Sequence, residues 1–520
     1  MNKIFLFSMM IASATTAVAQ NSYDAYNIAS SDLNGTARYV GMGGALSALG
    51  GDVSVMGTNP AGTAMYRKSE AAFTLSGVFA DDGVLGHDGT RASIDNAGVV
   101  VALPVDEGTL NYVNFGFNYH KNKNFLQNIS TGIDHLDGIF SQTFQIANLA
   151  SQCYNNSLYI YTDPKTGVES EEIDWDKWSS LAYQSVTLSN SNDSYANSLI
   201  DVNENYDGEN DRRAYLGIPA QSAAYQRAQW GHNSQMDANL SFNVLDKYFF
   251  GLTLGVYSLD SHRESLYGET AFDGSAYDIY NYYDQRGDGV DLKFGFICRP
   301  IDDSNFRFGV SVHTPTWYRL EDVCGSEICL ASKNGLDYTS SLYLDPWEYN
   351  YRTPWKFALS LGHTIGDYFA IGAEYEYTDM STAHYSQHDD YLGAYYREQN
   401  EYIKHNLKGQ STLKLGMEVK PAPSFSIRAG YNYISSPFES DAYNTINYLD
   451  NFTETDFTNW KDTHRFTVGL GYRYNGGYID LAYQYQSQKG DFYAFDDVDL
   501  KSTEINNDRS QLLCTFGFRF

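Results

Sequence analysis

Basic residues are scarce in this chain. Its 520 residues include 35 lysines and arginines against 64 aspartates and glutamates, which gives a formal net charge of −29 at pH 7. A nucleic-acid partner requires a basic face for the phosphates, and docking to anionic lipid requires a polybasic segment. The composition therefore excludes both kinds of partner.

Long apolar runs are absent as well. A membrane-spanning helix needs about 20 apolar residues, whereas residues 98–105, GVVVALPV, form one of the longest runs after residue 20. Lipid offers no hydrogen bonds to a backbone, so only helices and closed barrels cross it. The chain after residue 20 is therefore either soluble or a membrane-spanning β-barrel.

Cysteine and histidine form no catalytic or metal-binding pattern. There are five cysteines, and an odd number excludes a fully paired disulfide framework. Neither a CxxC pair nor a Cys/His cluster with zinc spacing is present. Cys324 and Cys329 either pair across a loop or remain two thiols. No histidine spacing selects a serine or aspartate partner, so we expect no enzyme activity, cofactor or metal.

Residues 1–19 have the plan of a secretory signal peptide. Lys3 precedes an apolar stretch from Ile4 to Ala12, and Ala17-Val18-Ala19 is a small-residue cleavage site. No cysteine follows directly to carry a lipid anchor. We expect an exported protein that begins at Gln20.

Alternation of apolar and polar residues dominates the rest of the chain. Residues 510–520, SQLLCTFGFRF, place an apolar side chain at every second position, which is the pattern of a half-exposed strand. The opposite faces of such segments carry glycine and charged residues, which suits a wet lumen. Several apolar rows end in tyrosine, as at Tyr472 and Tyr474, and interfacial aromatic girdles have this form.

Short turns and long polar loops alternate between these segments, as in transmembrane barrels. The pattern predicts an all-β fold, a 14-stranded antiparallel transmembrane β-barrel over residues 70–520, with a large extracellular loop at about 122–232. An even number of strands lets the first and last close antiparallel. The expected strands are 70–80, 95–104, 109–121, 233–245, 247–260, 288–301, 304–316, 351–365, 367–379, 408–420, 424–434, 463–475, 477–488 and 508–520.

Residues 20–69 do not alternate and are crowded with glycine. Gly41-Met42-Gly43-Gly44 departs from the GxGxxG spacing of a nucleotide loop and follows no strand. Small residues permit tight packing and positive φ. The segment therefore reads as a compact unit that fits inside something narrow.

This segment resembles the N-terminal hatch of FadL-type outer-membrane transport proteins, which carry long-chain fatty acids or aromatic hydrocarbons. The resemblance rests on Gly41, Gly43 and Gly44, and on Asn59-Pro60-Ala61-Gly62. It implies a fourteen-stranded barrel, plugged by residues 20–69, in the outer membrane of a Gram-negative bacterium. The aromatic C-terminus would then be recognised by the barrel assembly machinery.

The resemblance implies an outer-membrane channel through which small hydrophobic molecules, such as long-chain fatty acids, diffuse inward without catalysis. Its partners would be hydrophobic small molecules or lipids, including the outer-membrane lipid. A second interpretation stays open. Some FadL-like barrels act as scaffolds or shuttles in protein secretion, and the large 122–231 loop would suit contact with secretion-system proteins.

The third strand carries an irregularity. Val113, Phe115 and Phe117 share one face, whereas Leu110 and Tyr112 have the other parity. A β-bulge at Tyr112-Val113 produces such a slip, and FadL-like channels have a kink in the third strand that opens the wall sideways. Alternatively, Leu110 and Tyr112 lie at the rim, where facing matters little.

Overall fold

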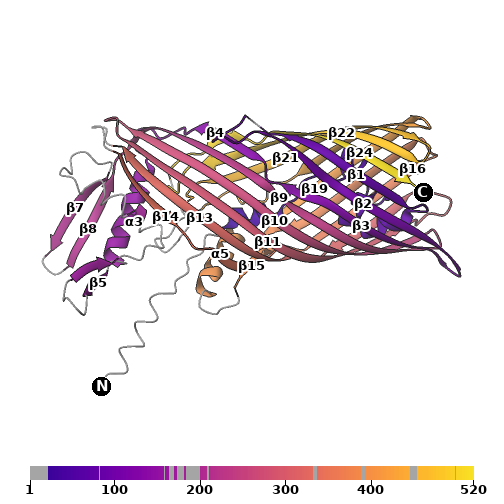
Figure 1. Ribbon diagram of the computed structural model, residues 1–520, viewed down its shortest axis with the longest axis horizontal. Coiled ribbons are helices and arrows are strands. Elements are labelled where there is room, and N and C mark those ends of the chain that lie inside the picture. The colour runs from indigo at the N-terminus through magenta and orange to yellow at the C-terminus, as the bar shows by residue number, and fades with distance from the viewer. Residues whose placement is uncertain are drawn as a thin grey trace, which may run out of the picture.

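The computed structural model describes residues 21–520, except for 81, 157–158, 163–168, 173–180, 183–199, 208–209, 332–336, 388–392, 445–453 and 498. The predicted signal peptide lies outside the described residues. Most of these residues form a single barrel whose strands run along the long axis of the molecule (Figure 1).

Fourteen antiparallel strands form the wall, which confirms the predicted fold class. The last strand pairs with the first from Glu70↔Arg519 to Phe79↔Ser510, so the barrel is closed. In order around the wall the strands are β1 (Glu70–Phe79), β2 (Thr90–Glu107), β3 (Leu110–Asn124), β9 (Ala220–Val244), β10 (Tyr248–Ala271), β11 (Ala276–Cys298), β12 (Arg307–His313) with β13 (Trp317–Ala331), β16 (Lys356–Ile365) with β15 (Trp347–Arg352), β17 (Phe369–Asp379) with β18 (His384–Ser386), β19 (Gly409–Ala422), β20 (Phe425–Ile434), β21 (Phe457–Tyr474), β22 (Gly477–Tyr493) and β24 (Arg509–Arg519).

Two neighbouring wall strands are each interrupted by a proline. Pro315 separates β12 from β13, and Pro354 separates β15 from β16. Proline has no backbone N–H to donate to the ladder. Threonine hydroxyls replace part of the lost pairing, since the Leu292 N–H donates to Thr314 Oγ1 at 3.0 Å and the Thr316 N–H donates to Thr353 Oγ1 at 2.8 Å.

The polarity of the wall inverts along its length. In β10 the outward side chains from Phe250 to Val256 are apolar, and the lumen-facing Thr253 is fully buried. Further along the same strand the outward residues are polar, beginning at Ser258, and the buried inward residues include Leu259. The end with the short turns therefore presents an apolar belt to lipid, whereas the outer surface at the end with the long loops is polar and suits contact with water.

The long-loop end of the lumen is filled by a packed aromatic core. Tyr277, Tyr349, Tyr351 and Tyr385 are at most 2% exposed and join the largest apolar cluster of the described chain. Buried tyrosines require partners for their hydroxyls. Tyr351 accordingly donates to the Ala25 carbonyl at 2.7 Å. These buried tyrosines are a separate set from Tyr472 and Tyr474, which are 54% and 69% exposed on the outer face.

Smaller elements close and extend the long-loop end. They are β4 (Gln127–Gly132), α3 (Gln142–Asn156), β5 (Tyr159–Thr162), β6 (Glu169–Glu172), β7 (Ile200–Asp207), β8 (Asn210–Gly217), β14 (Asp337–Tyr343), η4 (Met380–Thr382), α5 (Gly393–Asn406) and β23 (Thr503–Asn506). Figure 1 shows α3, β7 and β8 beyond this end of the wall. No helix within the described part of the chain is long and apolar enough to span a membrane.

Several wall strands extend beyond their predicted ends. The fourth was expected to begin at residue 233, but β9 begins at Ala220, and β3 continues to Asn124. The insertion between them is therefore shorter than the expected loop of residues 122–232. The parts of the strands that the sequence did not predict lie beyond the apolar belt, toward the long loops. There the outward side chains are polar and apolar side chains point inward, so the pattern of a lipid-facing strand is lost.

The third strand carries two register shifts against β9. Leu110 pairs with Val244 and Tyr112 with Asn243, which leaves Asn111 as the extra residue. This shift lies one residue nearer the turn than the predicted Tyr112-Val113 pair. From Tyr112 to His120 the strand pairs continuously with both neighbours. A sideways exit at this bulge stays a prediction. The second shift leaves Asn122 as the extra residue.

Cys324 and Cys329 lie on the same strand, β13, and no disulfide joins them. Their separation of five residues is odd, and side chains an odd number of residues apart on a strand point to opposite faces. A disulfide between them would break the pairing of β13 with β11. The alternative of two thiols therefore describes this pair.

The apolar belt predicts where a charge disrupts the barrel. Leu470 is 47% exposed on the outer face and pairs with Ile427 and Leu481. Leu470→Arg should cost about 2–4 kcal/mol of folding free energy in a bilayer, because lipid cannot solvate the charge. Urea titration of the protein refolded into vesicles measures this loss. Ser258→Arg, above the belt and beside Asp288, is the matched control, and equal losses would contradict the placement of the belt.

Candidate functional site

Residues 21–69 lie inside the lumen as four short helical segments. They are α1 (Ser22–Ala29), α2 (Ala37–Gly41), η1 (Val53–Gly57) and η2 (Pro60–Met65), and we call them together the hatch. Each begins at a polar side chain that accepts from a following backbone N–H, namely Asn21, Thr36, Asp52 and Asn59. Such caps satisfy the free N–H groups of short helices, so the sequence sets each start locally.

Backbone contacts between the hatch and the wall depend on glycine. Gly362, Gly372, Gly416 and Gly430 pair with one another across β16, β17, β19 and β20. A Cβ on Gly416 would overlap the Met42 carbonyl, and one on Gly430 would overlap the Gly43 nitrogen. Gly43 also has a φ of +60°, which favours glycine. The wall glycines thus form a seat for the hatch backbone.

Asn59 and Pro60 are seated in the same way on the neighbouring part of the wall, where β12 pairs with β16. Asn59 is fully buried in extended geometry, with φ of −127° and ψ of 100°. Its Oδ1 accepts from the Ala61 N–H at 3.1 Å, and its Nδ2 donates to the Val310 carbonyl at 3.4 Å. A Cβ on Gly251 would overlap the Pro60 carbonyl group. Both predicted hatch motifs therefore contact wall glycines.

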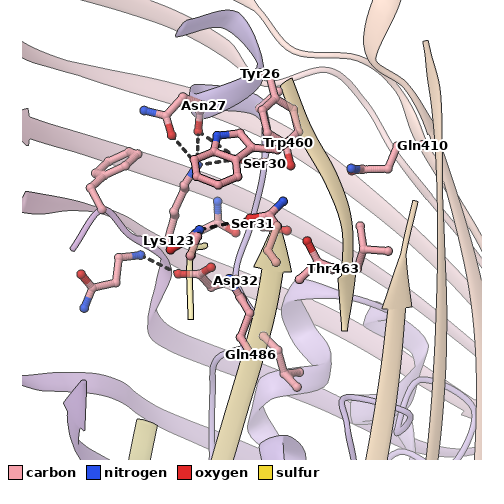
Figure 2. A pocket seen from close by; sticks show the side chains of 18 of the residues that line it. Tyr26, Asn27, Ser30, Ser31, Asp32, Lys123, Gln410, Trp460, Thr463 and Gln486 are labelled. Carbon is pink, nitrogen blue, oxygen red and sulfur yellow. Dashed lines mark hydrogen bonds between the residues drawn. The ribbon is translucent and has the colours of Figure 1, made fainter. Parts of the chain in front are cut away.

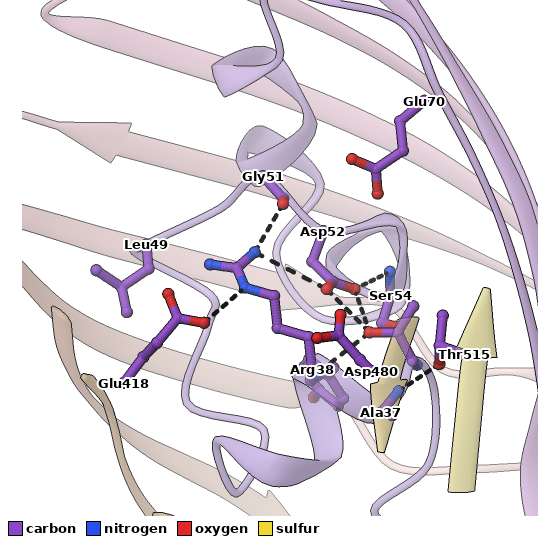
Figure 3. A network of polar contacts seen from close by, with 12 residues as sticks. Ala37, Arg38, Leu49, Gly51, Asp52, Ser54, Glu70, Glu418, Asp480 and Thr515 are labelled. Carbon is purple, nitrogen blue, oxygen red and sulfur yellow. Dashed lines mark hydrogen bonds and ion pairs between the residues drawn. The ribbon is translucent and has the colours of Figure 1, made fainter. Parts of the chain in front are cut away.

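Arg38 connects the hatch electrostatically to the wall (Figure 3). Its guanidinium donates to the Gly51 carbonyl at 2.8 Å and lies 3.5 Å from Glu418 of β19. The same carboxylate accepts from Arg428 at 2.6 Å, and Arg428 also pairs with Asp480 at 2.6 Å. All these groups are buried or nearly so. Removing one of them would leave a buried charge uncompensated, which is costly.

A cavity of about 230 Å³ lies between the lower part of the hatch and the packed long-loop end. Its lining combines aromatic rings with charged and amide groups (Figure 2). The aromatic residues are Tyr23, Tyr26, Phe125, Phe438, Phe457 and Trp460, and the charged residues include Asp24, Asp32, Lys123, Arg227, Arg263, Arg465 and Arg509. Apolar and polar parts of one molecule can therefore be held in the same space.

Helix α1 borders the cavity and is fastened to the wall and loops by single side chains. The Tyr23 ring stacks on Phe438 with centroids 5.0 Å apart. Asp24 pairs with Arg263 at 2.9 Å. Lys123 Nζ donates to the Asn27 carbonyl at 2.6 Å and to Asn27 Oδ1 at 2.7 Å. These contacts are noncovalent, so α1 can move away without the breaking of a covalent bond, at the cost of these hydrogen bonds and this ion pair.

The bulge at Asn122 determines where Lys123 points. His120 faces the lumen, since it lies 3.4 Å from the buried Asp237. Lys123 is three residues further along β3, and in a regular strand an odd separation would turn it outward. The extra residue reverses the alternation, and Lys123 reaches Asn27 inside the barrel.

Asp32 lies among cations at the cavity wall. It pairs with Arg509 at 2.6 Å and lies 3.6 Å from Arg465, and it accepts from the Asn124 N–H at 2.9 Å. Burial raises the pKa of the Asp32 carboxyl, but Arg509 and Arg465 outweigh burial and hold the pKa below its usual value. The carboxylate therefore stays ionised at neutral pH and fixes both arginines beside the cavity.

The sequence singled out residues of the N-terminal segment but not the cavity. Gly41, Gly43, Gly44, Asn59, Pro60, Ala61 and Gly62 all lie in the hatch against the wall or against one another. Three residues that meet at the cavity come from distant parts of the chain. Lys123 lies on β3, Asp32 in the hatch and Trp460 on β21. No spacing along the chain joins them, because the barrel closure alone brings them together.

Comparison with known proteins places the chain by its fold. No protein-family model and no curated protein sequence matches it. A deltaS2 mutant of the monoaromatic hydrocarbon channel TodX is 12% identical with a TM-score of 0.50, over 94% of this chain and all of that one. The toluene transporter TodX of P. putida is 13% identical with a TM-score of 0.48, over 94% and 99%. A FadL homologue of Pseudomonas aeruginosa is 13% identical with a TM-score of 0.46, over 94% and 98%. At such identities the likeness is one of fold.

The glycine seat predicts a specific cost for a single methyl group. Gly416→Ala would force the Met42 carbonyl away from β19 and should destabilise the seated hatch by about 1–3 kcal/mol, as overpacking does. Protease cleavage within residues 21–69 of the folded protein reports the seating and should accelerate. Gly477→Ala is the control, because the nearest atom would be 3.5 Å from the new Cβ. Unchanged cleavage in Gly416→Ala would contradict the seat.

The ion pairs of Asp32 predict a pH-dependent effect. Because the pKa is lowered in the folded protein, the contribution of this carboxylate is complete above its unfolded pKa of about 4 and is lost as pH falls through the folded value. Asp32→Asn should therefore loosen α1 and residues 30–34 by about 2 kcal/mol at pH 7. Hydrogen exchange of these amides at pH 7 and at pH 3 checks this, and a difference between the two proteins that is as large at pH 3 as at pH 7 would contradict it.

Proposed function

We propose that the protein is an outer-membrane channel through which small hydrophobic or amphipathic molecules diffuse inward. The observation that carries the proposal is the cavity of aromatic and polar side chains between the hatch and a wall with an apolar outer belt. The short turns would face the periplasm and the long loops the cell exterior, as in other barrels of this kind. TodX, whose deltaS2 mutant shares this fold, is a monoaromatic hydrocarbon channel, which supports a solute of this class.

The cavity supports a solute with both an apolar and a polar part. Its volume of about 230 Å³ is below the roughly 300–1,000 Å³ of typical small-molecule sites. A small aromatic compound, or one end of a longer molecule such as a long-chain fatty acid, would fit. Aromatic rings around Trp460 offer the apolar contacts, and the guanidinium groups of Arg465 and Arg509 offer donors to a polar group. No step in this passage requires catalysis.

A second candidate function is that of a scaffold or shuttle in protein secretion. It is favoured by α3 and the β7–β8 hairpin, which extend beyond the wall at the long-loop end (Figure 1). Mass spectrometry of the protein purified from its membrane separates the two functions. Small molecules released on denaturation would support the channel, and a stoichiometric protein partner with no such molecules would support the scaffold.

Passage through the lumen requires the hatch to move, which a reversible crosslink tests. Thr63 Oγ1 of the hatch lies 2.8 Å from Ser241 Oγ of β9, so cysteines at both positions should form a disulfide. The oxidised Thr63→Cys/Ser241→Cys variant should lose at least tenfold in uptake of a hydrophobic probe into proteoliposomes, and reductant should restore it.

Ser76→Cys/Ser93→Cys is the matched control. These hydroxyls are 3.5 Å apart on β1 and β2, so their disulfide staples two wall strands and leaves the hatch free. Uptake should be unchanged in this variant under oxidising conditions. Normal uptake by the oxidised hatch variant would contradict a route through the hatch.

A further inference from the structure

The lumen-facing side chains at the short-turn end are basic, although the chain as a whole is acidic. Five wall strands place a lysine or arginine at the last inward position before the rim. They are Arg299 after β11, Arg307 at the start of β12, Lys420 on β19, Arg473 on β21 and Arg519 on β24. We call these five residues the basic mouth.

Acidic groups near the basic mouth are already occupied. Glu70 is 1% exposed and accepts from Arg519 and from Tyr478. Glu418 is 3% exposed and is held between Arg38 and Arg428, with Lys420 at 3.7 Å. Other acids of this end, such as Asp302, lie on the turns, where Asp302 pairs with Lys247 at 2.7 Å.

Three members of the basic mouth form no contact ion pair with the acidic side chains that the structure describes. The Nε atoms of Arg299, Arg307 and Arg473 are buried without a hydrogen-bond acceptor. Arg299 lies over the Phe249 ring at 5.6 Å, and Arg473 over the Tyr478 ring at 5.9 Å. Arg307 reaches the Leu49 carbonyl and Met65 Sδ of the hatch. Guanidinium groups favour carboxylates as partners, so the mouth has unused capacity for them.

The spacing of the cations suits several carboxylates on one extended chain. Lys420, Arg473 and Arg519 lie on alternate wall strands, with β20 and β22 between them. Neighbouring strands are about 4.8 Å apart, so alternate strands are separated by about 10 Å. Acidic residues three apart in an extended peptide are separated by about the same distance, at roughly 3.3 Å per residue.

We propose that the basic mouth binds an acidic, extended segment of a periplasmic protein. The hatch separates the mouth from the cavity, since Arg307 and Arg519 both donate to hatch carbonyls. A solute from the cavity therefore reaches these arginines only after the hatch moves, whereas a protein segment would approach them from the short-turn end, without passing the hatch. The orientation of the mouth toward the periplasm rests on the proposed outer-membrane location, but the affinity for an acidic peptide does not.

A labelled peptide tests the proposal on the full-length protein in neutral detergent. A ten-residue peptide with glutamate at every third position should bind in fluorescence anisotropy. A peptide of the same design with lysine should not bind. Affinity for the acidic peptide should fall at least tenfold between 50 and 500 mM NaCl, because salt screens exposed charges. Absence of binding at low salt would overturn the proposal, whether or not the protein transports a solute.

Arg299→Gln/Arg473→Gln should weaken peptide binding at least tenfold. These arginines have no ion pair that the fold requires, so the barrel should remain folded, as its gel mobility before heating shows. Arg286→Gln/Arg319→Gln removes the same charge from exposed side chains at the far end of the wall and should leave binding unchanged. Equal affinity of the two double variants would overturn the assignment to the mouth.

Octanoate separates a protein-docking surface from a solute exit. A single carboxylate cannot span cations on alternate strands, so octanoate at an equal concentration of carboxylate should displace less than a tenth of the bound peptide. Displacement equal to that by unlabelled acidic peptide would overturn the proposal and indicate a site for the departing solute.

Discussion

The close approach of the hatch backbone to the wall backbone is the contact on which the lumen depends. It exists because Gly372, Gly416 and Gly430 leave the wall without side chains at one height. Any larger residue would hold the hatch off the wall and open a path past it. The buried pairs of Arg38, Glu418 and Arg428 then fix the orientation of a segment whose position the glycines already allow. The glycines thus let the hatch backbone reach the wall, and the ion pairs fix its position along the wall.

The sequence could predict those parts of the molecule whose signal is local. The alternation in strands such as β24 depends on one lipid-facing row and one lumen row, so strand number and closure followed from it. The caps and glycines of the hatch are local too. Charged residues and glycine opposite the apolar rows indicate a wet or polar lumen, and the lumen is polar here, but its glycines are tightly packed, since a Cβ on Gly471 would overlap Asp480 and meet Arg428. The alternation of apolar and polar residues along a strand does not show which distant residues pack against its glycines.

The rest could not be predicted because it depends on reversals of the same pattern. Tyr257 and Leu259 are inward and buried, yet an apolar residue on a strand above the belt has the same appearance as one facing lipid. The strands therefore seemed to stop where their polarity changes. The cavity needed two further events that no window of sequence contains. The bulge at Asn122 turns Lys123 inward, and the closure of the barrel brings Asp32 and Trp460 to it.

The inversion of polarity along β10 also has a consequence for assembly. Its lower half presents apolar side chains to lipid, whereas Tyr257 and Tyr267 of its upper half are buried by the residues of the long-loop end. The two halves therefore belong to different folding environments, although they share one hydrogen-bonded ladder. The lipid-facing half has to form with the bilayer, whereas the upper half must cross the bilayer before its tyrosines find their partners. Crossing exposes rows of uncommitted hydroxyls to hydrocarbon, which makes translocation of the upper half, and not closure of the lower one, the step expected to limit assembly.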